Sequence, residues 1–279
     1  GVDGGVGLDA FDDEAVIPIE GAGALIVTTD SHVVTPISFP GGDIGRLAIS
    51  GTVNDLAMMG GTRPLGLTSS IVIEEGTEVS LVESVNDSMR AACDEAGCSI
   101  VTGDTKVMGP GELDTIIVNT AGVAHVPDGH YVADAGRSVG DVIIVSGTVG
   151  DHGITLLAAR EGFDFEGDLE SDVAPVNGLV EAAMNAGRVT AMKDPTRGGI
   201  AGVLNEMAEK ADVGIEVREA DVPVAGSVAS ASSVLGIEPM NVANEGAVVF
   251  GVNADDAEDV LEAIRSHPLG ESAAIVGEV

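Results

Sequence analysis

The chain has 279 residues, and its 46 acidic and 12 basic side chains give a formal net charge of −34. This balance argues against nucleic acids and anionic membranes as partners, because no basic stripe exists to meet their phosphates. Hydrophobic residues make up 44% of the chain, enough for the cores of roughly two domains of about 150 residues each. We expect a protein of a halophile, since molar salt shortens the Debye length to about 3 Å and screens such a charge.

No basic and apolar leader and no apolar run of about 20 residues occurs, so we expect a cytoplasmic protein. Cys93 and Cys98 are the only cysteines. On one helix they would be separated by about 7.5 Å of rise, so we do not expect a mutual disulfide.

Short apolar strands alternate with helical patterns, which predicts an α/β protein, with an α+β N-terminal and an α/β C-terminal domain. For the first half we predict strands at 25–29, 67–73, 100–102 and 115–126, and helices at 44–59 and 81–96. A polar segment from Pro127 to Gly140 interrupts this pattern, and we place the boundary there, with domains at 1–133 and 134–279.

The second half resumes with the same alternation. We predict strands at 142–145, 189–192, 214–217, 247–252 and 273–276, and helices at 154–160, 174–185, 200–208, 228–235 and 254–266. The heptapeptide Asp194–Ile200 joins one of these strands to the next helix, with Thr196 as a plausible N-cap. Its two glycines, Arg197 and the helix N-terminus suit an anion. An ordinary glycine-rich turn is the alternative interpretation.

Three aspartates occur in apolar surroundings, where a salt-adapted surface does not explain them. Asp30 and Asp104 each follow a predicted strand, and Asp55 interrupts the apolar helix. If neighbouring strands bring Asp30 and Asp104 together, the group needs a cation, and Mg²⁺ with the phosphates of a nucleotide satisfies it. Asp13 precedes the first strand and is a further candidate. A cap, a turn or salt adaptation is the alternative for each of these acids.

Lysine is so rare here that Lys106, two residues after Asp104, is a candidate for neutralising phosphate charge or positioning a reacting group. Lys193 and Lys210 are interpreted as a flank of the Asp194 motif and as a surface residue.

These residues resemble a known family. The pattern of Asp12–Asp13, Thr29–Asp30, Asn54–Gly60 and Gly103–Thr105 is similar to the ATP-binding superfamily of aminoimidazole ribonucleotide synthetase, thiamine-monophosphate kinase and selenophosphate synthetase. Four stretches resemble the HypE carbamoyl dehydratases of hydrogenase maturation more specifically: Phe39–Gly45, Ser146–Gly153, Asp194–Gly199 and Ala243–Gly246.

The resemblance implies a homodimer of two-domain subunits that binds ATP and Mg²⁺. It implies Mg²⁺ ligands at Asp13, Asp30, Asp55 and Asp104, with Asn54, Asp194, Arg197 and Gly198 also at the ATP site. Lys106 and Glu245 are implied as the catalytic groups near a carboxamide, where a carboxylate assisted by a cation suits proton removal. A turn cap is the alternative for Glu245, and His152 is as readily structural as catalytic.

The implied reaction is the ATP-dependent dehydration of a carbamoylated C-terminal cysteine to a thiocyanate, which supplies the cyanide of [NiFe] hydrogenase. The implied partners are a carbamoyltransferase and the iron-carrier proteins that accept the cyanide. The chain as given ends at Val279 without such a cysteine, so we do not expect it to modify itself. The alternatives are another small-molecule kinase or synthetase of the superfamily, or a nucleotide-binding assembly factor without turnover.

Overall fold

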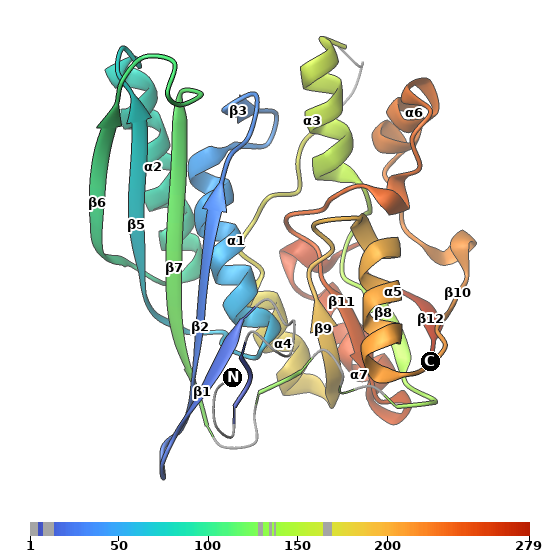
Figure 1. Cartoon of the computed structure of the whole chain (residues 1–279). Helices are drawn as coiled ribbons and strands as arrows, with labels where there is room; N and C mark the ends of the chain where they lie inside the picture. Colours follow the sequence, from blue (N-terminus) through green and yellow to red (C-terminus); the bar gives the residue numbers. More distant parts are fainter. Residues whose placement is uncertain (1–4, 8–13, 128–130, 134–135, 137, 164–168) are drawn as a thin grey trace. The chain divides into compact units, whose positions relative to one another are not determined.

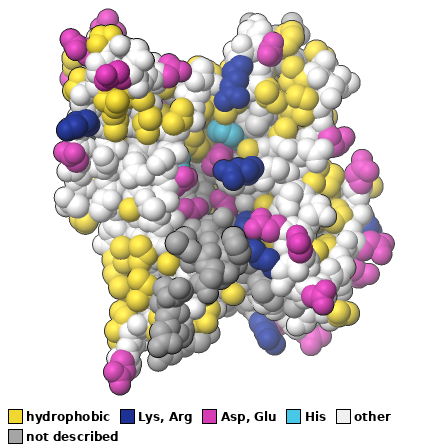
Figure 2. Space-filling view, viewed as in Figure 1, with side chains coloured by type: hydrophobic (Ala, Val, Ile, Leu, Met, Phe, Trp, Pro, Cys, Tyr) yellow, Lys and Arg dark blue, Asp and Glu magenta, His cyan; other side chains and the backbone are white. Residues whose placement is uncertain are grey.

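The computed structural model describes the chain except for residues 1–4, 8–13, 128–130, 134–135, 137 and 164–168. Two compact units divide it (Figure 1): residues 1–38 with 42–131, and residues 39–41 with 132–279. The predicted N-terminal domain includes residues 39–41, whereas the structure groups them with the second unit. On the face that Figure 2 shows, acidic side chains are spread over both units, and lysines and arginines are fewer. Among the described residues, no helix has both the length and the apolar character needed to cross a membrane.

The chain up to Val126 forms strands and two long helices. In order, these are β1 (Ala15–Ile19), β2 (Gly23–His32), β3 (Ser38–Phe39), β4 (Gly42–Asp43), α1 (Ile44–Met58), β5 (Pro64–Glu74), α2 (Val79–Ala96), β6 (Ile100–Met108) and β7 (Ile116–Val126). The main sheet has the order β1-β2-β7-β5-β6, in which only β5 and β6 run parallel.

Alternating burial along β7 defines the two faces of this sheet. Ile116, Val118 and Thr120 are buried, and the residues between them are partly exposed, as expected for a strand with one face on the core. The hydroxyl of Thr120 donates to the backbone carbonyl of Ala48 in α1 at 3.1 Å. The buried face is therefore the one that α1 covers, and we call the opposite side the open face.

Helix α1 is enclosed almost completely, which explains why its sequence is apolar on nearly every side. Its N-cap is Asp43, whose Oδ1 accepts hydrogen bonds from the Arg46 N–H at 2.8 Å and the Ser88 hydroxyl at 2.7 Å. All of its residues are buried except Arg46 and Asp55. Asp55 is thus the one carboxylate of this helix, and it lies where the helix reaches the surface.

The sequence underpredicted the two edge strands of this sheet, and it did not predict the separate two-stranded sheet of β3 and β4. β1 was not predicted, and β6 extends to Met108 instead of ending at Thr102. Every residue of β6 from Ile100 to Val107 is exposed. An exposed edge strand has no need of apolar alternation, so its polar segment resembled a loop.

The cysteines lie closer together than helical spacing predicts. Helix α2 ends at Ala96, and Gly97 adopts a left-handed conformation with φ 66°. The N–H of Cys98 then donates to the Cys93 carbonyl at 3.0 Å, and the two thiols hydrogen bond to each other. This is a Schellman ending whose side-chain contact is made by the two cysteines. Both are free thiols.

The second unit is built around another five-stranded sheet. Its elements are β8 (Val142–Val145), α3 (Asp151–Glu161), α4 (Asn177–Ala186), β9 (Val189–Lys193), α5 (Gly199–Ala211), β10 (Glu216–Val217), η2 (Glu219–Asp221), α6 (Gly226–Leu235), η3 (Pro239–Asn241), β11 (Val249–Val252), η4 (Ala254–Asp256), α7 (Ala257–Arg265), η5 (Pro268–Gly270) and β12 (Ala274–Glu278). The strand order is β10-β12-β8-β11-β9, with antiparallel neighbours.

The core of this unit joins its sheet to α5. Ile143 and Val249 of the sheet pack with Ile200, Val203 and Met207 of that helix. Each predicted strand and helix of the second half has an observed counterpart, and all of them except β8 have shifted ends. The mixture of helices and strands confirms the predicted α/β class.

The start of α5 is pressed against the η3 segment. Gly199 has φ 61°, and a β-carbon on it would lie 2.5 Å from the carbonyl oxygens of both Met240 and Val242. Gly198 precedes it as the N-cap, also left-handed at φ 80°, and no side chain caps the helix. The expected N-cap at Thr196 is therefore wrong, because the chain turns through the two glycines and the Thr196 carbonyl accepts the Gly199 N–H at 3.2 Å.

Gly199→Ala should lower the free energy of unfolding by at least about 2 kcal/mol, since it adds left-handed strain and a clash with two carbonyls. The measurement is denaturant unfolding at constant salt. Gly214→Ala is the control, because nothing lies within 4 Å of its β-carbon position. Equal stability of the two variants would show that the α5 start is not packed as described.

Candidate active site

Asp30 and Asp55 lie on the helix face of the first sheet. The Thr28 hydroxyl in β2 donates to Oδ2 of Asp55 in α1 at 2.8 Å. Asp30 is two residues further along the same strand face, and its Oδ2 lies 3.5 Å from Nε2 of the buried His32. Burial lowers the pKa of His32, so it is neutral at pH 7. Asn54, beside Asp55, is buried.

Asp104 and Lys106 lie elsewhere on the sheet, and the expectation that neighbouring strands join Asp30 to Asp104 is wrong. Strands β7 and β5 separate β2 from β6, so the two acids are three strand spacings apart, roughly 14 Å. Asp104 is in register with Ser70 and Asn119, on the open face. Both acids lie within strands rather than at their ends.

The oxygen donors of the helix face suit a nucleotide-bound magnesium ion. Mg²⁺ prefers hard oxygen ligands, and it commonly takes one or two carboxylates together with phosphate oxygens. Asp30 and Asp55 supply such a pair, and the part of the chain that the structure describes holds no group of three potential ligands. Asp13, the further candidate, lies outside the described residues. A metal held together with phosphates fits this donor set better than a metal held by protein alone.

In the second unit, the residues of the Asp194 motif differ in exposure. Asp194 is buried directly after β9, and Arg197 and Gly198 are exposed at the start of α5. Lys193, interpreted from sequence as a flank, is buried and pairs with Glu206 at 3.1 Å. An exposed guanidinium beside a helix N-terminus can bind an anion, as the sequence predicts for this motif.

Asn244 connects three of the stretches quoted above for the family resemblance. Its Oδ1 accepts the N–H of Gly150 at 2.8 Å, and its Nδ2 donates to the Thr148 carbonyl at 3.0 Å. Its backbone N–H donates to the Pro195 carbonyl at 2.9 Å. Asn244 is completely buried. The side chain of Asn244 thus ties the Ser146–Gly153 loop, and its backbone N–H ties the Asp194 turn, to the segment that carries Glu245.

Asp172 completes this cluster, and sequence analysis did not identify it. Its Oδ2 accepts hydrogen bonds from Asn244 Nδ2 at 2.8 Å and the Gly246 N–H at 3.0 Å, and its Oδ1 accepts the Glu245 N–H at 3.1 Å. Burial raises its pKa to about 6, against the lowering effect of these donors. Glu245 itself is partly buried. In a chain with 46 acidic residues, nothing in the sequence distinguishes Asp172 from surface acids.

His152 is held as a structural residue next to this cluster. Its Nδ1 lies 2.8 Å from the Ser171 hydroxyl, and its ring meets Phe39 edge-on with centroids 5.5 Å apart. Burial lowers its pKa to about 4, so the ring is neutral at pH 7. These contacts favour the structural interpretation of the two that the sequence left open.

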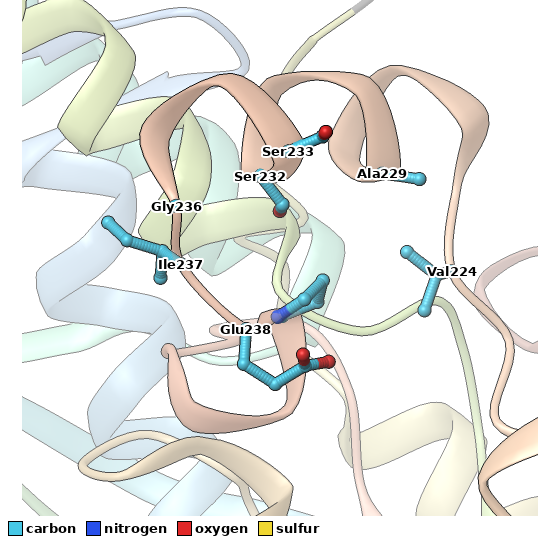
Figure 3. Close-up of a pocket in the computed structure, with 8 residues that line it drawn as sticks. Val224, Ala229, Ser232, Ser233, Gly236, Ile237 and Glu238 are labelled. Carbon is cyan, nitrogen blue, oxygen red and sulfur yellow. The ribbon is translucent and has the colours of Figure 1, made fainter.

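A separate hollow of about 540 Å³ lies between α6 and η3 (Figure 3). Its wall combines apolar side chains with the hydroxyls of Ser232 and Ser233, and Glu238 is its one titratable group. None of the predicted site residues lines it.

The chain matches the AIR synthase related protein N-terminal domain over residues 11–126 and the C-terminal domain over residues 138–279. Carbamoyl dehydratase HypE of Rhizobium leguminosarum bv. viciae is 45% identical over 98% of this chain and 78% of its own length. The structure is similar to HypE in a HypE–HypF complex, with a TM-score of 0.92, 44% identity and coverage of 97% of this chain and 88% of that one. It is also similar to the hydrogenase maturation protein HypE in complex with ATP, with a TM-score of 0.89, 41% identity and coverage of 97% and 80%. The chain therefore belongs to the AIR synthase related family and, within it, to the HypE carbamoyl dehydratases.

Proposed function

We propose that this protein is an ATP-dependent carbamoyl dehydratase of hydrogenase maturation, which converts an S-carbamoylated cysteine to a thiocyanate. The main structural support is the segment 244–246, where Glu245 follows a fully buried asparagine in a backbone fixed by Asp172. A carboxylate on such a fixed segment suits a base that must meet one defined proton. Membership of the HypE family supplies the reaction to which this base belongs.

In the proposed reaction the C–O bond of the carboxamide breaks and a C≡N bond forms. ATP, bound with Mg²⁺, supplies the phosphoryl group with which the carboxamide oxygen leaves as phosphate. The two amide protons must go to a base, and we assign their removal to Glu245. We place Lys106 near the same carboxamide, where an ammonium compensates developing negative charge. The resulting nitrile becomes the cyanide ligand of the hydrogenase iron.

For the nucleotide we propose Asp30 and Asp55 as ligands of Mg²⁺, with Asp13 and Asp104 completing the set. Asn54 would support Asp55 from the preceding, buried position of α1. We also propose Asp194, Arg197 and Gly198 as nucleotide-binding residues, because a guanidinium and the α5 N-terminus suit phosphate. The ATP complex of a HypE protein with this fold supports a nucleotide site in the family.

We propose a homodimer in which the open face of the first sheet meets a second copy. Asp104 and Lys106 lie on that face, three strands from Asp30, so a single sheet does not gather the proposed set. Partly buried apolar residues, Val27, Val72 and Ile117 among them, share the face with these charges. Association would cover this apolar surface and bring the two charges to a site shared between subunits.

The proposed partners are a carbamoyltransferase that loads the cysteine and an iron-carrier protein that accepts the cyanide. The solved complex of HypE with HypF supports the first for a close relative. The substrate cysteine is proposed to be that of a C-terminal tail, as the family resemblance implies. Turnover on a tail peptide would separate this proposal from an assembly factor that binds nucleotide without chemistry.

Asp55→Asn and Asp104→Asn should each weaken Mg·ATP binding by at least about tenfold, because each removes a negative charge from the proposed metal site. Isothermal titration calorimetry measures this directly. Asp87→Asn is the matched control, since Asp87 is an exposed α2 residue paired with Arg90. Affinities equal to that of the control would remove the tested aspartate from the site.

Glu245→Gln should slow thiocyanate formation by about 10²-fold or more, because it removes the base. The affinity for Mg·ATP should stay within about twofold of the wild-type value, because no phosphate contact is removed. The substrate is a synthetic peptide ending in S-carbamoylcysteine, and mass spectrometry follows its loss of water. Glu238→Gln, at an exposed position outside the site, is the control. Wild-type rates in the Glu245 variant would make that residue structural, and an inactive wild-type protein would contradict the proposed function.

A further inference from the structure

Asp172 meets three N–H donors with two oxygens. The donors are the side-chain amide of Asn244 and the backbone N–H groups of Glu245 and Gly246, at 2.8, 3.1 and 3.0 Å. An ionised carboxylate only accepts hydrogen bonds, so all three contacts can form together. An asparagine at this position would turn an NH₂ group toward at least one of the donors. The geometry thus requires the charged form of an acid.

The backbone around Glu245 depends on the Asp172 segment because it belongs to neither a helix nor a strand. Besides the two N–H contacts, the carbonyl of Glu245 accepts the Ala174 N–H at 3.3 Å. A β-carbon on Gly246 would lie only 1.8 Å from the Asp172 carbonyl oxygen, so the two segments are pressed together. The N–H and C=O groups of Glu245 are therefore both held by residues 172–174, which fixes the direction in which its Cα–Cβ bond leaves the backbone.

We propose that Asp172 is a positioning residue, whose ionised carboxylate holds the backbone of Glu245 and Gly246 so that the Glu245 side chain meets the carboxamide. The inference rests on the proposed function, because it assumes that Glu245 is the base. It adds one requirement to the proposed function. Asp172 must be ionised for Glu245 to remove protons efficiently, although Asp172 is not itself the base.

Because Asp172 must be ionised, the proposed positioning of Glu245 should depend on pH. Burial raises its pKa to about 6, and the nearby carboxylate of Asp151, at the start of α3, adds to the rise. Glu245 on the held segment is a further acid close to it, and His152 is neutral there because burial lowers its pKa to about 4. Below pH 6, a proton on Asp172 places an O–H among three N–H donors. The hold on Glu245 is then lost as the pH falls, and it is complete above about pH 7.

The test compares Asp172→Asn with wild type for thiocyanate formation and for hydrogen exchange of the Glu245 and Gly246 amides. We expect kcat to fall about 10²-fold, as for a reacting group displaced by about 1 Å. We expect the KM for ATP to stay within about twofold. The two amides should exchange at least about tenfold faster in the variant. The wild-type kcat should decline below pH 6, and that limb should be absent from the residual activity of the variant.

Asp141→Asn is the matched control. Asp141 is buried and accepts hydrogen bonds from the Ser138 N–H at 2.9 Å and the Thr190 hydroxyl at 2.8 Å, but it lies outside the Asn244 cluster. This variant should lose stability without losing kcat. An equal kcat loss in both variants would reduce Asp172 to a general stabilising role and would overturn the inference.

Three further outcomes are decisive. Wild-type kcat and unchanged amide exchange in Asp172→Asn would overturn the positioning role. If wild type forms no thiocyanate, the proposed function fails, and the exchange comparison still decides whether Asp172 holds the Glu245 backbone. If Asp172→Asn does not fold, the wild-type pH profile decides. The range from pH 5 to 7 covers roughly one unit on each side of the Asp172 pKa. A wild-type kcat that stays constant over this range would overturn the inference.

Discussion

The hydrogen bonds of the buried Asn244 side chain hold the second unit's functional segments together. Its oxygen and its NH₂ group are both used, toward Gly150, Thr148 and Asp172. A buried amide costs free energy unless its hydrogen bonds are made, and a fully satisfied polar cluster specifies one arrangement of the chain. The loop after β8, the segment before α4 and the Glu245 segment have no shared secondary structure, so this cluster defines their relation. The glycines at 150, 199 and 246 allow the close approaches that it requires.

The two units contribute different chemistry to the proposed reaction. The first offers carboxylates on a rigid sheet and an enclosed helix, where Asp55 is the single carboxylate of α1. The second offers a carboxylate on an irregular segment stabilised by charge-assisted hydrogen bonds. A metal ion can take its remaining ligands from the phosphates of the nucleotide, so the protein need not supply them all. A base that removes a proton must instead point at that proton, so its position must be fixed. The more elaborate hydrogen-bond support around Glu245 is consistent with that difference.

Sequence patterns predicted the parts of this fold that depend on local apolar periodicity. The run Val142–Val145 became β8 with the predicted ends, and α1 was predicted within one residue. The prediction that Asp30 and Asp104 lie on neighbouring strands was wrong, because strand order is set by long-range pairing that no local pattern contains. Thr196 failed as a cap since a backbone turn through two glycines replaced the side chain. Asp172 was missed because its importance comes from three donors distant along the chain and not from its neighbours in sequence.

The most direct test of this account is a double-mutant cycle on unfolding free energy with Asn244→Ala, Asp172→Ala and the double variant. Because the two side chains share a buried charge-assisted hydrogen bond and the same segment, we expect a coupling free energy of at least about 1 kcal/mol. Single effects that add to within about 0.5 kcal/mol would contradict the claim that these two residues act as one cluster.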